Sequence, residues 1–196
     1  MREANIEPWF IDSCSKIKYM FPKAHAAAYV ISAFRVAYFK VHHPAWYYAS
    51  YFSVRCDDFD IETMIKGYDA IKQKIIEITN KGFEASNKET AVLDVLRIAL
   101  EATARGITFR PIDLYKSEAI NFSLAEDGKS LYPPFRSIDG LGGTVAENIV
   151  AERNKGAYIS IEDLQTRGKV SATLIDKMRV MGVLEGLPES SQLSLF

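Results

Sequence analysis

Two glycines enclose a single leucine at Gly140-Leu141-Gly142, and the residues after this segment have helical spacing. Glycine lets the backbone adopt left-handed angles and lets another molecule approach without a side chain in the way. Ala146 is small where two helices would cross, and Ile149 would point back into such a pair. The segment therefore predicts a tight turn between helical elements, with Leu141 attaching the turn to the core.

The helix expected after this turn would offer its first unpaired N–H groups, and the positive end of its dipole, to an anion. Contacts of this kind hold a nucleic-acid backbone without reading its sequence. The alternative is a glycine-capped loop before an unrelated helix, but small and apolar residues stay in phase from 138 to 149. We therefore predict a helix-hairpin-helix turn that binds duplex DNA. The residues expected to contribute are Gly140, Leu141, Gly142, Gly143, Thr144, Arg153 and Lys155.

The net charge of −1 hides an uneven distribution along the chain. Residues 1–56 hold seven Lys and Arg against three Asp and Glu, whereas residues 57–132 hold ten against fourteen. Residues 133–196 hold seven against eight. The first segment is suited to a polyanion surface. The remainder must bind DNA through backbone contacts, because its bulk charge is not favourable.

Several classes of site and location are not expected. No stretch of 18 residues is free of charged side chains, which argues against a membrane span, and no secretory signal is visible. Cys14 and Cys56 lack a second Cys or His two to four residues away, as a zinc site would need. We expect reduced thiols, no metal ligands and a cytoplasmic location.

Helical periodicity dominates the first half of the chain. One helix is expected at 24–42, and Pro44 can end it and open the next. Asp60 is suited to cap a third helix that runs to Gly82, and a capping box at 86–89 begins a fourth.

A change in pattern follows residue 110. Two short runs at 121–125 and 129–132 flank Asp127-Gly128, which predicts a β-hairpin. Three short helices are then expected, at 143–153, 161–166 and 171–181, before residues 185–191, which lose periodicity. The predicted fold is mainly α, with a helical subdomain followed by a small α+β module that contains the hairpin and the glycine turn. The predicted divisions are 1–110, 111–186 and a flexible tail at 187–196.

The segment FPKAHAAAY at residues 21–29 has its own chemistry. Lys23 and His25 lie in the first turn of a helix, where the dipole favours an anion. Three consecutive alanines make one face of this helix narrow, and Tyr29 can offer a flat ring to a base. These residues fit contact with a nucleotide. The alternative is a solvated helix start.

Here the sequence carries a resemblance. KIKYMFPKAHAAAYV and YFKVHHP resemble the fingers region of bacterial family C replicative DNA polymerases, in particular the PolC type. The similarity continues through FDIETMIKG, IDLYKSEA, LYPPFRSIDGLG and EDLQTRGK to the last residue. It implies the later part of the fingers followed by a duplex-binding module. It also implies that Lys23 and His25 lie close to the incoming dNTP, with Tyr29 near the nascent base pair.

The resemblance also implies what this chain does not contain. In that family the metal-binding aspartates belong to a palm domain, and none of the palm or exonuclease motifs is in this sequence. The acidic run Asp57-Asp58-Phe59-Asp60 is explained as a helix N-terminus. Phosphoryl transfer would need two metals held by carboxylates. We therefore expect no catalytic residue, metal ligand or cofactor here, with Mg²⁺ implied only for the full-length polymerase, and no polymerisation by this chain alone.

The last five residues form a short apolar anchor with one amide, which suits a groove on a partner protein. They resemble the sliding-clamp-binding motif of bacterial replication proteins, and a short linker would keep the local clamp concentration high. The alternative is that the tail folds back onto its own domain. The residues expected to bind the clamp are Gln192, Leu193, Ser194, Leu195 and Phe196.

The main hypothesis is a part of a replicative DNA polymerase whose partners are duplex DNA, dNTP, the sliding clamp and the remainder of the enzyme. A free-standing helix-hairpin-helix adaptor that docks on the clamp is the alternative, and a purely structural helical domain is the third. The FPKAHAAAY segment favours the first, because an adaptor has no reason to keep a helix that faces a triphosphate.

Overall fold

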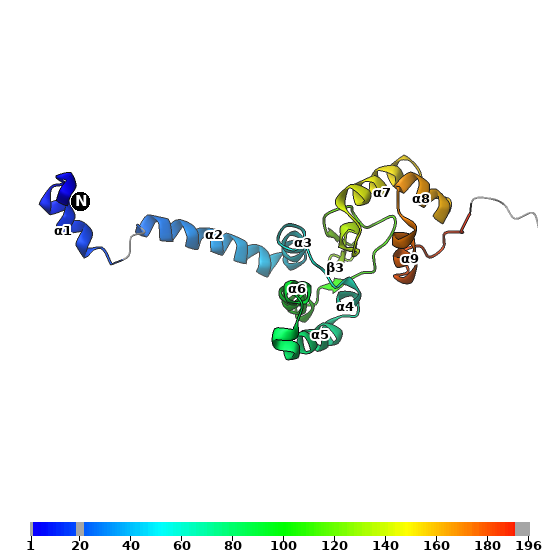
Figure 1. The fold of residues 1–196 in the computed structure, drawn as a ribbon, viewed down its shortest axis with the longest axis horizontal. Coiled ribbons are helices and arrows are strands. Elements are labelled where there is room, and N and C mark those ends of the chain that lie inside the picture. The colour runs from blue at the N-terminus through cyan, green and yellow to red at the C-terminus, as the bar shows by residue number, and fades with distance from the viewer. Residues whose placement is uncertain (1, 19–21, 191–196) are drawn as a thin grey trace, which may run out of the picture. The chain divides into compact units, whose positions relative to one another are not determined.

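A computed structural model describes residues 2–18 and 22–190 of the chain (Figure 1). The chain divides into two compact units, Met1–Val41 and His42–Phe196. The described part is mainly helical with one small sheet, which confirms the predicted fold class. None of the described helices is both long and apolar enough to cross a membrane.

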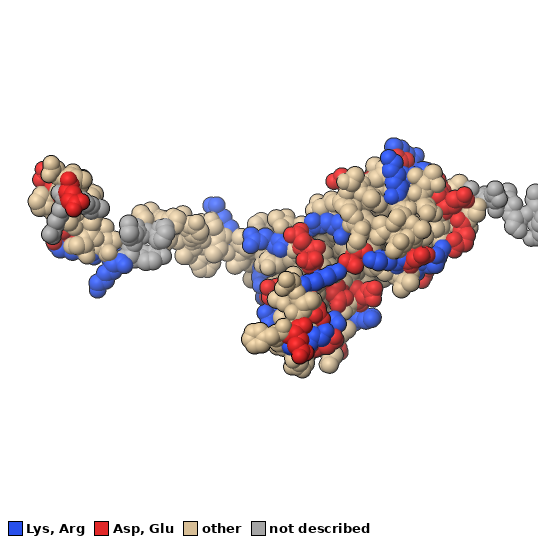
Figure 2. Space-filling model, viewed as in Figure 1, with Lys and Arg blue, Asp and Glu red and all other residues tan. Residues whose placement is uncertain are grey.

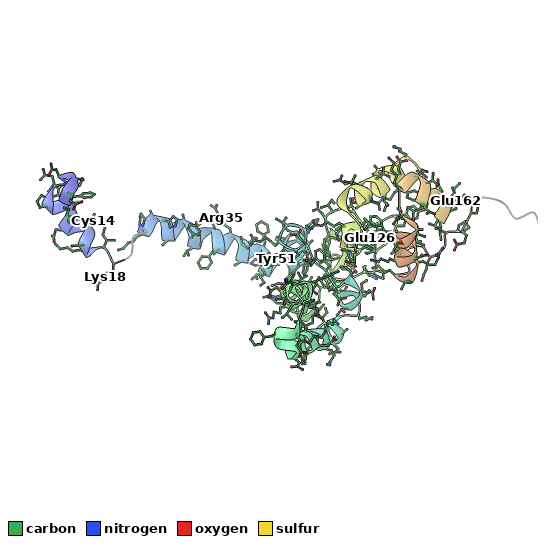
Figure 3. The ribbon with its side chains drawn as sticks, viewed as in Figure 1. Cys14, Lys18, Arg35, Tyr51, Glu126 and Glu162 are labelled. Atoms are coloured by element: carbon green, nitrogen blue, oxygen red, sulfur yellow. The ribbon has the colours of Figure 1, made fainter. Side chains whose placement is uncertain are left out.

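The first unit contains η1 (Arg2–Ala4), α1 (Pro8–Lys16) and nearly all of α2 (Lys23–His42). The predicted helix at 24–42 is confirmed. None of the described side chains of this unit is buried, and apolar residues such as Phe34 are largely exposed, at 73%. Figure 2 shows few charged side chains along α2, and Figure 3 labels one of them, Arg35.

The second unit begins with helices whose starts follow from local sequence. They are α3 (Pro44–Arg55), α4 (Ile61–Ile65), α5 (Tyr68–Lys81), η2 (Gly82–Glu84) and α6 (Asn87–Ala104). Pro44 opens α3, where its fixed φ suits a first helical position. Ser86 and Glu89 form the predicted capping box of α6, since each side chain accepts the backbone N–H of the other residue.

The single helix expected between Asp60 and Gly82 is wrong. Asp60 does cap α4, because its carboxylate accepts the N–H of Thr63 at 3.1 Å. The chain then turns at Gly67, whose φ of 86° lies in the left-handed region and ends the helix. Two helices therefore replace one, and α5 packs against α6 as its neighbour in the unit.

The sheet has three short strands, β1 (Thr108–Phe109), β2 (Ser123–Leu124) and β3 (Ser130–Tyr132), in the order β1-β3-β2. β2 and β3 form the predicted antiparallel hairpin. Asp127 closes its turn, since its carboxylate accepts the N–H groups of Lys129 at 2.8 Å and Ser130 at 2.7 Å. The sequence did not predict β1, which is two residues long and pairs in parallel with β3.

Four elements complete the unit: η3 (Phe135–Ser137), α7 (Gly143–Lys155), α8 (Ile161–Gly168) and α9 (Ala172–Val180). The three short helices predicted here are confirmed. Ser160 caps α8 and Ser171 caps α9, each by accepting a backbone N–H three residues further on.

One hydrophobic core runs through the second unit. The ring of Phe52 on α3 lies 5.5 Å from that of Phe109 on β1 and 5.4 Å from that of Phe122 before β2. The N–H of Phe122 also donates to the hydroxyl of Ser53 at 2.8 Å. The compact unit thus crosses the boundary expected near 110–111, and a functional division at that point stays a prediction.

Candidate nucleic-acid interface

The Gly140-Leu141-Gly142 turn lies between η3 and α7. Leu141 is buried and its N–H donates to the carbonyl of Ile138 at 2.9 Å, so the turn is attached to the core as expected. Gly140 has a φ of 86°, an angle that favours glycine. Gly140, Gly142 and Gly143 are exposed, and this arrangement presents bare backbone to solvent.

The amides at the start of α7 follow directly from this turn. The N–H groups of Val145 and Ala146 both donate to the carbonyl of Gly142, at 3.1 and 3.0 Å. The amides of Gly143 and Thr144 precede these bonds and lie outside the helical ladder. Both residues are exposed, and the first turn of α7 carries no acidic side chain. The positive end of the helix is therefore open to an anion.

The far side of α7 packs against α8. Ala146 and Ile149 are completely buried, as their phase in the sequence predicts. A Cβ atom at Gly168 would lie 3.4 Å from Ile149, so the two helices meet closely at a glycine. The element before the turn is only the short η3, and α8 provides the helical partner of α7.

Tyr158 joins these two helices from the loop between them. Its hydroxyl donates to the carbonyl of Ile149 at 2.9 Å, and the guanidinium of Arg167 lies 4.8 Å from the centre of its ring. Burial raises the pKa of Tyr158 to about 12, so the phenol stays protonated and keeps donating well above neutral pH.

The two cations expected on α7 have different surroundings. The side chain of Arg153 is only 8% exposed, and its guanidinium donates to the carbonyls of Leu114 and Ser117 at 2.9 and 2.6 Å. Arg153 therefore holds the loop between β1 and β2 in place and does not face solvent as the sequence suggested. Lys155 is exposed and pairs with Glu152 at 2.5 Å. It lies roughly 18 Å along α7 from the turn, too far to share one phosphate with it.

Two lysines that the sequence did not single out lie beside the turn, on either side of Asp139. Lys88 of α6 donates to one carboxylate oxygen of Asp139 at 2.6 Å. Lys177 of α9 donates to the backbone carbonyl of Asp139 at 2.8 Å and lies 3.3 Å from the other carboxylate oxygen. These lysines hold the pKa of Asp139 below its usual range, and Asp139 raises that of Lys88.

The residues expected near a nucleotide lie on the first two turns of α2. The rings of His25 and Tyr29 are 4.6 Å apart, with their planes inclined at 59°, and both side chains are exposed. Lys23 is the first residue of the helix, and no acidic residue lies in its first turn. The three residues thus share one end of α2.

The expected clamp-binding residues, Gln192 to Phe196, lie outside the described residues. The chain just before them is docked on the second unit, although a tether was expected from residue 185. The N–H of Ile161 donates to the carbonyl of Pro188 at 2.9 Å, and Arg179 pairs with Glu189 at 2.9 Å. Ser190 donates to Glu162, which Figure 3 labels at the start of α8, at 2.8 Å. The lack of periodicity in this segment reflects an irregular path and not the absence of contacts.

The acidic run before α4 has structural partners. Asp60 caps α4, and Asp57 lies 3.6 Å from the guanidinium of Arg136. Within the residues that the structure describes, no group of three or more His, Cys, Asp and Glu side chains is placed to hold a metal ion.

A comparison with known protein families identifies the class of the module that contains the glycine turn. A family model described as a helix-hairpin-helix motif matches residues 106–193, which include the glycine turn and helices α7 to α9. The second unit therefore contains a helix-hairpin-helix module, as the turn and its helix pair indicate.

The whole chain is similar to particular proteins. It is 57% identical over all 196 residues to DNA polymerase III PolC-type of Bacillus subtilis, of which it covers 14%. It is 58% identical over 188 residues, 96% of the chain, to the protein of the same name from Listeria innocua, of which it covers 13%. The chain is thus homologous over its length to a part of PolC-type DNA polymerase III, and spans about one seventh of these relatives.

Proposed function

We propose that this chain holds duplex DNA by its phosphates as part of a PolC-type DNA polymerase III. One observation carries the proposal: the exposed glycines of the turn lead directly into amides of α7 that lie outside its helical ladder. The helix-hairpin-helix match and the name of the relatives support it.

The contact is with the backbone of DNA and not with its bases. The amides of Gly143 and Thr144 donate to phosphate oxygens, and the hydroxyl of Thr144 adds a further donor. Phosphate contacts position a duplex without reading its sequence, as replication requires. Because few cations surround the turn, binding by the isolated chain is weak and depends on salt as expected for a few phosphates.

The test of this proposal is Gly142→Val. The φ of Gly142 is −71°, and no atom lies within 4 Å of the position where a Cβ would be, so the fold accepts the substitution. The new side chain would stand where a phosphate approaches, and affinity for a short duplex should fall at least about tenfold.

The matched control is Gly156→Val at the other end of α7. Gly156 has an extended backbone with a φ of 170° and also has open space around its Cβ position. Both variants should unfold at the temperature of the wild-type chain, and only Gly142→Val should lose duplex binding in fluorescence anisotropy. Equal binding by both variants would show that the turn is not the contact.

We further propose that α2 begins beside the incoming dNTP, with Lys23 and His25 near the triphosphate and Tyr29 near the nascent base pair. The support is the shared end of α2, its lack of acidic residues and the resemblance to polymerase fingers. The last five residues are proposed to bind the sliding clamp. In the full-length polymerase, this part of the chain would then position the nucleotide, bind the duplex and attach the enzyme to the sliding clamp.

The chemistry itself belongs to the full-length enzyme. Mg²⁺ would be held there by carboxylates that we do not assign to this chain, and primer extension by the chain alone would contradict this view. A clamp-docked adaptor is less well supported, because the similarity to DNA polymerase III includes α2 as well as the helix-hairpin-helix module.

A further inference from the structure

Asp139, the residue just before the glycine turn, is held by lysines from two different helices. Lys88 reaches it from the start of α6, 51 residues away in the sequence, and Lys177 reaches it from α9, 38 residues away. A Cβ atom on Gly140 would lie 3.6 Å from the ammonium group of Lys177. One anion and two cations therefore adjoin the backbone that we propose to bind phosphate.

These ion pairs are exposed, and each lysine can exchange Asp139 for another anion. The side chains of Lys88 and Asp139 are 59% and 69% exposed, and that of Lys177 is 43% exposed. Exposed ion pairs contribute little to stability, because water screens them and both side chains lose entropy. Lys88 and Lys177 can therefore leave Asp139 at low cost when another anion is offered.

A hollow of about 320 Å³ beside the turn is the place where such an anion would enter. Lys88, Asp139 and both glycines of the turn line it, together with Asp57 and Asp58. Lys177 is not part of this lining and reaches the turn through Asp139 and Gly140. The other cation of the hollow is Arg136, whose guanidinium donates to the carbonyls of Ser53 and Cys56 at 2.9 and 3.0 Å and is thereby engaged inside the fold.

The balance of charge around this hollow determines what can bind there. In the free chain the carboxylates offset the cations, so that a phosphate gains little attraction at a distance. Attraction becomes favourable only when the lysine head groups turn from the carboxylate of Asp139 toward the phosphate.

We propose that Lys88 and Lys177 are phosphate-binding residues of the turn, and that Asp139 occupies them until DNA docks. Asp139 thus keeps both lysines close to the turn and competes with the DNA backbone for them. The proposal rests on the proposed function of the turn and adds two contacts from outside it. In this proposal, Asp139 lowers the affinity of the chain for duplex DNA.

The experiment measures duplex affinity of the 196-residue chain over a range of salt concentrations. Lys88→Gln and Lys177→Gln should each weaken binding about tenfold at low salt and lower the salt slope by about one. Asp139→Asn should strengthen binding about threefold to tenfold and steepen the slope, because the lysines then lose counterions and not a carboxylate when DNA binds.

The control is Lys72→Gln, since Lys72 is an exposed lysine on α5 that does not line this hollow and, unlike Lys88 and Lys177, is not paired with Asp139. It should leave affinity nearly unchanged. The gain from Asp139→Asn should largely disappear when both lysines are glutamine, because its main effect is to release them. Thermal unfolding of each variant should match the wild-type chain.

The outcomes separate this inference from the proposed function. If Gly142→Val abolishes binding but the lysine variants bind as wild type, or if Asp139→Asn binds more weakly, the turn stands and the lysine assignment is overturned. If both lysine variants weaken binding while Gly142→Val does not, the lysines bind phosphate but the turn does not. A wild-type chain that binds no duplex at low salt would overturn both.

Discussion

Arginine and lysine have different tasks in the second unit. Arg136, Arg153 and Arg167 all donate to backbone carbonyls within the fold. The planar guanidinium can satisfy several carbonyls at once, which suits this work. Lys88 and Lys177 keep their ammonium groups near the surface, where their partners include a carboxylate. We therefore expect backbone amides and lysines to make the proposed contacts with phosphate.

This division predicts the effect of losing Arg153. Arg153→Met would leave the carbonyls of Leu114 and Ser117 without their donor inside the fold, and should lower the free energy of unfolding by about 2 kcal/mol. Urea denaturation of the isolated chain measures this change.

Lys155→Met is the control for this measurement. Lys155 lies two residues further along α7 and makes only an exposed pair with Glu152, so the variant should be within about 0.5 kcal/mol of wild type. If Arg153→Met is equally stable but binds duplex less well, Arg153 faces DNA and not the loop.

At the scale of elements, α2 differs from every α-helix of the second unit. It buries no residue, although Val30, Phe34 and Tyr38 are apolar or aromatic and exposed. A helix with apolar residues on all sides is usually covered by other parts of a protein. The relatives are about seven times longer than this chain, so their other segments are available to cover it.

The role of Lys23 must therefore be measured in a full-length PolC-type polymerase that carries this sequence. Lys23→Ala should raise the KM for dNTP about tenfold, because one charge-assisted contact to the triphosphate is lost. Steady-state primer extension at varied dNTP measures this change.

Arg35→Ala is the control on the same helix, three turns further along (Figure 3). It should leave the KM for dNTP within about twofold of wild type. If Lys23→Ala has the kinetics of wild type, α2 does not begin at the nucleotide.

At the scale of the whole molecule, the docked segment before the tail limits how far the tail can reach. Contacts at Pro188, Glu189 and Ser190 attach the chain to α8 and α9, so the proposed clamp-binding residues begin soon after the last described contact. A tether this short would place a bound clamp close to the helix-hairpin-helix module and raise its local concentration.

Replacing Leu195 and Phe196 together with alanine should therefore weaken binding to the Bacillus subtilis sliding clamp at least about tenfold, because the apolar anchor is removed. Ser194→Ala is the control and should retain binding. Surface plasmon resonance with immobilised clamp measures both, and undiminished binding of the double variant would rule out the tail as the contact.

Much of the local structure was predictable from the sequence alone. The capping box at Ser86, the hairpin turn at Asp127 and the glycine turn at residues 140–142 are all present. Each depends on interactions between residues a few positions apart, which are legible in a linear sequence. The break at Gly67 is also local but was missed, since glycine inside a helical pattern does not by itself require a positive φ.

Only the tertiary structure decided which charges surround the turn. The side chain of Arg153 is covered because the loop between β1 and β2 lies over it, and β1 exists because β3 is there to pair with it. Lys88 and Lys177 meet at Asp139 across 51 and 38 residues of chain. Such long-range contacts depend on how the helices pack, and no spacing in the sequence predicts them. The sequence determined the glycine turn that we propose to bind phosphate, and the packing of α6 and α9 determined which cations lie beside it.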